Sequence, residues 1–185
     1  MGDDPENVID RFLRNFDNKF TSDLYDALDA LNDRLAQRMR ENAFTETEIA
    51  DAKLSLYDLI TVASLVEKET ARTSESATIA SVIYNRLTNT SATNGLLNID
   101  ATILYATGGT VVDTSADTPY NTYRHAGLPP TAIANPGADA LRAAVNPEST
   151  SYYYYALGDD GVHHFFKTHQ EQLSFIATQE RYRNG

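Results

Sequence analysis

The stretch LITVASLVEKET, from Leu59 to Thr70, is apolar for most of its length and ends in charged residues. At about 100° per residue, its apolar side chains cover one broad arc of a helix. Glu67 and Glu69 fall on the two edges of this arc and point away from each other, while Lys68 lies nearly opposite its centre. Each glutamate therefore has apolar neighbours on a helix that the pattern predicts to be buried.

Two interpretations of this charged end are open. Either the helix emerges into water and both carboxylates are solvated, or apolar surroundings raise the pKa of one carboxyl group. Burial disfavours the charged form, so a glutamic acid in a dry setting stays protonated near neutral pH. Cleavage of a glycosidic bond requires such a protonated carboxyl group as general acid. Taken alone, the stretch favours solvated acids.

Composition limits the class of protein. The chain has 185 residues, 42% of them apolar, which suits one domain with a buried core. Its formal charge of -11 argues against nucleic acid and anionic membrane surfaces as partners, because both require clustered lysine and arginine. The absence of cysteine excludes disulfides and thiolate metal sites. No signal peptide is recognisable, and no apolar run reaches the roughly 20 residues that span a bilayer.

The first half of the chain has helical periodicity. Ser55 followed by Asp58, and the run that begins at Thr45, are N-terminal capping patterns. The spacing predicts helices over residues 5–42, 45–52, 55–71 and 76–87.

The second half is irregular, because small and polar residues with glycine and proline dominate residues 88–136. An irregular stretch of this length inside a compact domain usually carries function. The run SYYYYALGDDGVHHFF predicts a β-hairpin that turns at GDDG. Short helices are predicted over residues 101–106 and 136–144, strands over 152–157 and 162–166, and a last helix over 168–183.

Five blocks occur in a recognisable order between about Leu59 and Gln172: LITVASLVEKETA, ASVIYNRL, LNIDATILYA, TPYNTYRHAGLPPTAIANPGADALRAAVNP and YYYYALGDDGVHHFFKTHQEQ. In these blocks the chain resembles the catalytic domain of the MltG (YceG-like) endolytic murein transglycosylases. The resemblance implies an α+β fold, with a lysozyme-like helical catalytic part, a loop-rich region and a β-hairpin. It places the catalytic domain at residues 55–185, and we expect the N-terminal helical region, 1–54, to form one compact unit with it.

The resemblance also implies a reaction. Lytic transglycosylases cut the MurNAc-β-1,4-GlcNAc bond of peptidoglycan without adding water. One glutamic acid protonates the leaving oxygen and then accepts the proton of the MurNAc C6 hydroxyl, which closes a 1,6-anhydro ring; most glycosidases use two carboxylates instead. Glu69 followed by Thr70 resembles the Glu-Ser/Thr step of lysozyme-like transglycosylases. Glu69 is therefore the expected general acid/base and Glu67 the second candidate, and no cofactor is implied.

The block PYNTY is expected to line the substrate cleft. The rings of Tyr120 and Tyr123 can stack on sugars, and Asn121 and Thr122 can hydrogen-bond their acetamido and hydroxyl groups. The alternative is a packed loop whose tyrosines fill the core. In the proline-rich block GLPPTAIANPG, interpreted mainly as scaffold, Asn135 is a further candidate for a polar contact.

Arg86 and Asp100 are two charged candidates near the expected cleft. Arg86 either binds a substrate carboxylate or holds a structural acid such as Asp100, and the structural role is favoured. Asp100 lies in LNID, where relatives tend to show LQTDPT. The acid itself is retained, which keeps a role in positioning Glu69 or the glycan, but its neighbours depart from the family pattern.

The histidines near the C-terminus invite a zinc site, but the spacing of His163, His164, His169 and Glu171 matches no standard one. No metal is therefore expected. Relatives tend to carry a histidine where Gln172 stands, so that residue's family role does not transfer to this chain.

Peptidoglycan glycan strands are the expected partner, and cell-wall synthases are candidate partners. The resemblance implies a full-length protein anchored at the extracytoplasmic face of the bacterial membrane, with an anchor that this chain does not include. Two other functions stay open. A hydrolytic muramidase would need a second carboxylate, for which Asp100 is the candidate. A non-catalytic glycan-binding or scaffold module of the wall-synthesis machinery would not depend on Glu69.

Overall fold

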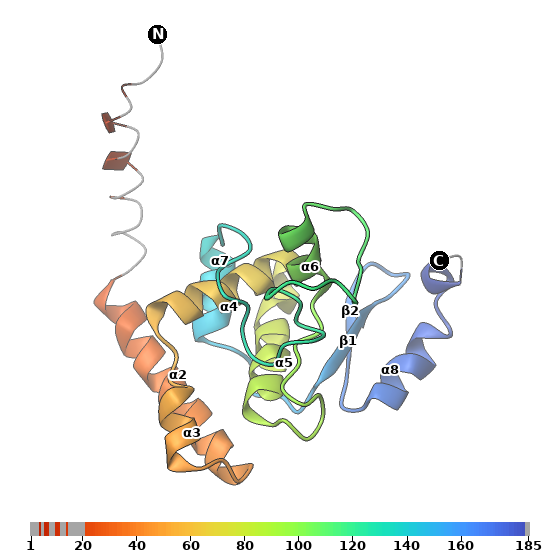
Figure 1. Cartoon of the computed structure of the whole chain (residues 1–185), viewed down its shortest axis with the longest axis horizontal. Coiled ribbons are helices and arrows are strands. Elements are labelled where there is room, and N and C mark those ends of the chain that lie inside the picture. Colours follow the sequence, from red (N-terminus) through yellow and green to blue (C-terminus); the bar gives the residue numbers. More distant parts are fainter. Residues whose placement is uncertain (1–3, 5, 8–9, 12–13, 15–20, 184–185) are drawn as a thin grey trace.

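The structure is a computed structural model that describes residues 4, 6–7, 10–11, 14 and 21–183. Helices build most of it, and a two-stranded antiparallel hairpin followed by one more helix lies at one side of the helical part (Figure 1). The predicted α+β class is confirmed. The elements are α2 (Ser22–Glu41), α3 (Glu46–Asp51), α4 (Leu56–Glu69), η1 (Thr73–Glu75), α5 (Ser76–Thr88), α6 (Asp100–Thr107), α7 (Ala138–Val145), β1 (Tyr154–Leu157), β2 (His163–Phe166), α8 (His169–Ile176) and η2 (Glu180–Tyr182).

Helix α4 lies in the core and packs against α5, α6 and α7. From Thr61 to Val66 every side chain is buried, the apolar ones and the small polar ones alike. Ser64 shows how the polar groups are satisfied: its hydroxyl donates to the carbonyl of Thr61 at 2.7 Å and accepts the N–H of Ile133 at 3.0 Å. The buried middle of this helix fixes the position from which its last turn emerges, because the helix cannot shift without disturbing the packed core.

Three helices begin with a full capping box, in which the cap hydroxyl accepts the N–H three residues on and that residue's carboxylate accepts the N–H of the cap. Two of these starts were predicted from the sequence. The pairs are Thr45 with Glu48, Ser55 with Asp58, and Thr168 with Glu171.

The predicted helices over 45–52, 55–71, 76–87, 101–106 and 136–144 are confirmed as α3 to α7, with ends that differ by up to two residues. The helix predicted over 5–42 is confirmed from Ser22 onward as α2. The part of that prediction that falls on residues 5, 8–9, 12–13 and 15–20 lies outside the described residues.

The predicted hairpin is confirmed, with slightly shorter strands. Tyr155 lies opposite Phe165, and Leu157 lies opposite His163. Since side chains alternate along a strand, these four residues share one face of the hairpin. Gly161 in the turn has φ +73°, a conformation that strains any residue with a Cβ.

The last helix is shorter than the sequence predicts: α8 ends at Ile176 rather than near residue 183. The carboxylate of Asp159, in the hairpin turn, accepts the N–H groups of Glu180 at 2.6 Å and Arg181 at 3.0 Å. Arg181 donates in return to the carbonyl of Gly158 at 2.7 Å. These bonds to the hairpin turn replace a continued helix, and residues 180–182 form the short turn η2.

Helix α2 contributes Leu28, Leu31 and Leu35 to the same core as α4 and α5. The division between residues 1–54 and 55–185 stays a prediction. In the part of the chain that the structure describes, no helix combines the length and apolarity that a bilayer crossing requires.

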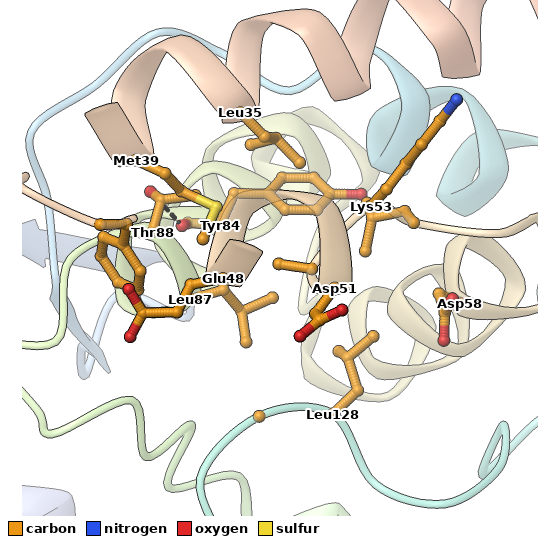
Figure 2. Close-up of a pocket in the computed structure, with 14 residues that line it drawn as sticks. Leu35, Met39, Glu48, Asp51, Lys53, Asp58, Tyr84, Leu87, Thr88 and Leu128 are labelled. Atoms are coloured by element: carbon orange, nitrogen blue, oxygen red, sulfur yellow. Dashed lines mark hydrogen bonds between the residues drawn. The ribbon is translucent and has the colours of Figure 1, made fainter. Parts of the chain in front are cut away.

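A cavity of about 330 Å³ lies where α2, α3 and α5 meet the loop around Leu128 (Figure 2). Tyr84 crosses it as a fully buried side chain, and its hydroxyl donates to the carbonyl of Ala144 at 2.9 Å. Leu35 and Met39 form part of its wall. The cavity belongs to the packing of the helical part, and none of its lining residues takes part in the candidate site described next.

Candidate active site around Glu69

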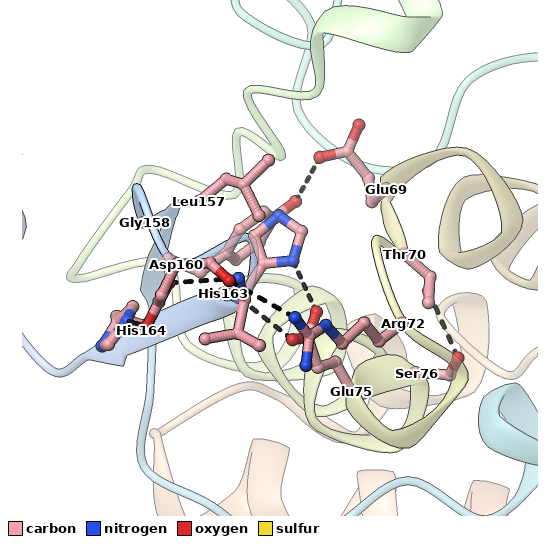
Figure 3. A network of polar contacts seen from close by, with 12 residues as sticks. Glu69, Thr70, Arg72, Glu75, Ser76, Leu157, Gly158, Asp160, His163 and His164 are labelled. Carbon is pink, nitrogen blue, oxygen red and sulfur yellow. Dashed lines mark hydrogen bonds and ion pairs between the residues drawn. The ribbon is translucent and has the colours of Figure 1, made fainter. Parts of the chain in front are cut away.

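Glu69 is the last residue of α4 and is half-buried where the helix leaves the core. The hydroxyl of Tyr155, on β1, donates to its Oε2 at 2.7 Å. Figure 3 shows the other carboxylate oxygen pointing away from this contact. Burial raises the pKa of Glu69 above its ordinary value; the Tyr155 hydrogen bond opposes this, the charge of Asp100 adds to it, and His163 and Arg86 act against it. Glu69 therefore stays protonated to higher pH than an ordinary glutamate.

The side chain of Glu67 points to a different side of α4 from that of Glu69. Its Oε2 accepts the N–H of Gly137 at 3.1 Å, at the start of α7. A carboxylate at this position is stabilised by the positive end of the α7 helix dipole. The neighbours of the two glutamates therefore differ: Glu67 supports a helix terminus, whereas Glu69 meets a tyrosine hydroxyl in a half-buried setting. This difference favours Glu69 as the acid.

Asp100 and Tyr123 lie within electrostatic reach of Glu69. Asp100 is exposed at the first position of α6, and its Oδ1 accepts the hydroxyl of Tyr123 at 2.6 Å. Burial, the hydrogen bond to Asp100 and the charges of Asp100 and Glu69 raise the pKa of Tyr123. Of the predicted site residues, the structure thus brings Glu69, Asp100 and Tyr123 together, and the charge of Arg86 acts on Glu69 and Tyr123 as well.

Asn121 and Thr122 lie elsewhere than predicted. Their exposed fractions are 0% and 2%, which leaves no surface for a sugar to contact. Asn121 donates to the carbonyls of Thr114 at 3.0 Å and Ala116 at 2.8 Å, and Thr122 accepts the N–H of Ile99 at 2.9 Å. The two side chains hold the loop from inside, because the irregular backbone here needs side-chain partners for its own polar groups.

Replacing Asn121 by alanine is expected to lower the free energy of unfolding by about 2 kcal/mol, because a fully buried side chain and its two hydrogen bonds to loop carbonyls are lost. Denaturant unfolding would measure the change. Asn135→Ala is the matched control: Asn135 is exposed, so its loss is expected to change stability by less than about 0.5 kcal/mol. Equal effects of the two substitutions would contradict this assignment.

Tyr120 and Asn135 differ in their surroundings. The hydroxyl of Tyr120 lies 2.7 Å from Oγ1 of Thr131, and its ring meets that of Tyr105 at 5.2 Å between centroids, so it follows the packed-loop alternative. Asn135 is exposed two residues before Gly137, whose N–H meets Glu67.

Arg86 is buried and connects the hairpin to the helical part. Its guanidinium donates to the carbonyl of Tyr153 at 2.6 Å and to the carbonyl of Leu97, and it lies 5.6 Å from the ring of Tyr154 and 5.9 Å from that of Tyr155. The structural role favoured by the sequence agrees with this placement. The partners, however, are backbone carbonyls rather than the expected Asp100, because the side chain turns inward to the carbonyls of Tyr153 and Leu97.

Sequence reasoning did not place three residues of this region beside Glu69: Tyr155, Glu75, and His163, which it considered only as a metal ligand. Tyr155 stood in a recognised run of four tyrosines, but only the hairpin register shows which of them faces Glu69. Glu75 accepts the Nδ1–H of His163 at 2.8 Å and its backbone N–H at 3.0 Å. The two residues are 88 positions apart, and no local signal joins them.

The other C-terminal histidines and Glu171 have separate partners. His164 pairs with Asp160 at 3.0 Å, His169 stacks on Tyr154, and Glu171 caps α8. Among the residues that the structure describes, no group of three or more histidine or acidic side chains could hold a metal ion.

Comparison with known proteins places these observations in a family. The sequence pattern of the YceG-like family matches residues 1–178. The endolytic murein transglycosylase of Bacillus subtilis (strain 168) is 38% identical over 138 residues, which cover 70% of this chain and 37% of that protein. The endolytic murein transglycosylase of Streptococcus pneumoniae (strain R6) is 30% identical over 162 residues, or 81% of this chain and 29% of that protein.

A 2.6 Å crystal structure of a YceG-like protein from Listeria monocytogenes is similar in fold, with a TM-score of 0.59 and 35% identity. The match covers 69% of this chain and 42% of that one. The chain thus spans less than half the length of each of these relatives. Since the family pattern matches residues 1–178, nearly the whole chain, this chain belongs to the YceG-like family.

Proposed function

We propose that this chain is the catalytic part of an endolytic lytic transglycosylase, which cleaves the MurNAc-β-1,4-GlcNAc bond of peptidoglycan and leaves 1,6-anhydro-MurNAc ends. One observation carries the proposal: a half-buried carboxyl group, that of Glu69, stands at the end of a core helix with one oxygen held by a tyrosine and the other free of that contact. The names of the relatives support the same substrate and reaction class.

In the proposed reaction Glu69 acts twice. As acid, it gives its proton to the oxygen that bridges the two sugars, and the bond between this oxygen and C1 of MurNAc breaks. As base, the resulting carboxylate accepts the proton of the MurNAc C6 hydroxyl, whose oxygen bonds to C1 and closes the anhydro ring. Glu69 ends protonated, ready for another turnover, and no water is consumed. A raised pKa suits the first step, since the acid must be neutral when the glycan binds.

The neighbours of Glu69 have distinct tasks in this scheme. Tyr155 fixes the carboxyl group in one orientation and stabilises its ionised form after the proton has left. The exposed carboxylate of Asp100 faces the positive charge that develops on the sugar ring, and Tyr123 holds that carboxylate in place. We further propose that the full-length protein acts at the extracytoplasmic face of the membrane, where its substrate lies and where cell-wall synthases would meet it.

A hydrolytic muramidase is the second candidate, favoured by the exposure of Asp100 and its electrostatic coupling to Glu69. In that case Asp100 would deprotonate a water molecule that attacks C1 in place of the C6 hydroxyl.

Mass spectrometry of the products formed from purified, uncross-linked glycan strands tests the proposal. Ends that carry 1,6-anhydro-MurNAc are the expected result, and the Glu69→Gln variant serves as control for contaminating enzymes. Reducing MurNAc ends would establish the hydrolase instead. No product from this chain together with retained binding of the strands would point to the non-catalytic module.

Tyr155→Phe is expected to lower kcat about tenfold, because the carboxyl group of Glu69 loses the hydrogen bond that orients it. This bond lowers the pKa of Glu69, so its removal raises that pKa further and the acid stays protonated to higher pH. The alkaline limb of the profile of kcat/KM against pH should therefore move to higher pH. An unchanged limb would show that Tyr155 does not act on the carboxyl group.

A further inference from the structure

Glu75 and His163 form a buried pair that the proposed reaction does not use. Their side chains are only 10% and 9% exposed. One oxygen of Glu75 accepts the Nδ1–H of His163 at 2.8 Å, and the other accepts the backbone N–H of His163 at 3.0 Å. Burying a carboxylate costs free energy unless its oxygens accept hydrogen bonds. Here both oxygens of Glu75 accept a hydrogen bond from His163, one from its ring and one from its backbone, and the pair acts as a clamp on this residue.

The clamp fixes the orientation of the His163 ring. An ionised carboxylate only accepts hydrogen bonds, so Nδ1 must carry the proton that faces Glu75. Figure 3 shows the His163 ring lying between Glu75 on one side and the hydrogen bond to Glu69 on the other.

The His163 ring in turn fixes Tyr155. The two residues are diagonal neighbours on one face of the hairpin, since Tyr155 pairs with Phe165 and Leu157 pairs with His163. Their rings meet edge to face, with centroids 5.4 Å apart and an interplanar angle of 87°. The hydroxyl of Tyr155 then donates to Glu69 at 2.7 Å. A chain of contacts thus runs from Glu75 through His163 and Tyr155 to Glu69.

The first and last residues of this series of contacts, Glu75 and Glu69, are also close in sequence. Glu75 lies six residues after Glu69, at the end of η1, so both ends of one short segment hold the same hairpin. Without the contact at Glu75, the ring of His163 loses the group that fixes it against the ring of Tyr155. The hydroxyl of Tyr155 would then leave the position from which it meets Glu69.

We propose that Glu75 and His163 are positioning residues for the acid, acting on Glu69 through Tyr155. The inference rests on the proposed function of Glu69. Glu75 makes no hydrogen bond to Glu69. A conservative change at Glu75 should nevertheless lower kcat while leaving glycan binding nearly unchanged.

A double-mutant cycle tests this route. Glu75→Gln keeps the size of the side chain and an oxygen for the N–H of His163, but places an amide group where the carboxylate met Nδ1. The expected result is a kcat about tenfold lower with KM within about twofold. In the Tyr155→Phe background the same change should cause almost no further loss of kcat, because the hydrogen bond through which Glu75 acts on Glu69 is already absent. Independent, multiplying losses would overturn the proposal.

The chain offers a matched control in the pair of Asp160 and His164, an acid and a histidine on the same hairpin, both more than a third exposed. Asp160→Asn is expected to leave kcat, KM and the pH profile unchanged. A loss equal to that of Glu75→Gln would show that any disturbance of the hairpin reduces activity, and would overturn the specific route.

A second measurement does not depend on activity. Titration of the Glu69 carboxyl carbon by NMR, assigned with Glu69→Gln, reports on the hydrogen bond from Tyr155. The groups that act on this carboxyl are Tyr155, Asp100, His163 and Arg86. Glu75→Gln should move the midpoint more in the wild-type background than in the Tyr155→Phe background, where only the direct effect of the His163 charge remains; equal shifts in the two backgrounds would overturn the route through Tyr155.

An unmoved midpoint in both backgrounds overturns the positioning role, whatever the enzyme does. If the chain gave no anhydro ends while the midpoints moved as expected, the proposed function would fail and the positioning of Glu69 would stand.

Discussion

Glu69→Gln is expected to lower the rate of glycan cleavage about a thousandfold, since general acid–base catalysis contributes roughly two to four orders of magnitude. The amide group fits the same space and can still accept the hydroxyl of Tyr155, so the orientation of the side chain is retained. It cannot give a proton to the leaving oxygen. Release of anhydro-terminated fragments from glycan strands, followed over time, measures the rate.

Glu67→Gln is the matched control, two residues away on the same helix. The amide oxygen of the glutamine can still accept the N–H of Gly137, so both fold and rate should stay near those of the wild type. The reverse result, with the loss at Glu67 alone, would assign the acid to the other side of α4.

The pH dependence of stability provides a check that Glu69→Gln folds. Burial raises the folded-state pKa of Glu69 above its unfolded value, so the native state binds this proton more tightly. The corresponding stabilisation is fully present below the unfolded pKa and is lost as pH rises through the folded pKa. Glutamine carries no charge, so above that pKa the variant should unfold with a free energy equal to or higher than that of the wild type. A loss of activity together with unfolding would remove the argument for catalysis.

Arg86→Ala is expected to lower the free energy of unfolding by about 3 kcal/mol or more. Two backbone carbonyls, those of Tyr153 and Leu97, lose their only charged donor, and each unsatisfied buried group costs about 1–3 kcal/mol. The rings of Tyr154 and Tyr155 also lose a cation on their faces. Denaturant unfolding with a shared slope for wild type and variant measures the difference.

Arg142→Ala is the control for this effect, because Arg142 is an exposed arginine that pairs with Asp139 one turn away on α7. A change below about 0.5 kcal/mol is expected there. If Arg86→Ala proved as stable as the wild type but bound glycan strands with carboxylated stems poorly, the alternative interpretation of Arg86 as a ligand for a substrate carboxylate would be right.

The parts of the fold that the sequence predicted depend on local rules. The apolar run of α4 and the capping boxes at Thr45 and Ser55 specify their helices within a few residues. The end of α8 does not follow from such rules. Asp159 draws the backbone of Glu180 and Arg181 to the hairpin turn, and a bond between residues 21 positions apart leaves no periodic signal.

The candidate site divides in the same way. The motif around Glu69 predicted a candidate acid, and the structural support for Glu69 over Glu67 comes from contacts 86 and 70 residues away along the chain. Asn121 and Thr122 have the chemistry of sugar ligands, and the same chemistry satisfies a buried loop. Residue type alone does not distinguish these uses; burial does.

The contacts of Tyr155 and His163 with Glu69 and Glu75 have a consequence for biosynthesis. A ribosome makes the acid long before it makes the hairpin that orients it, because 86 residues separate Glu69 from Tyr155. A nascent or prematurely terminated chain therefore carries the glutamate without its tyrosine or its histidine clamp. On the proposed function, a fragment that ends before the hairpin would carry Glu69 without the contacts that orient it, and its rate of glycan cleavage should fall at least as far as that of Tyr155→Phe.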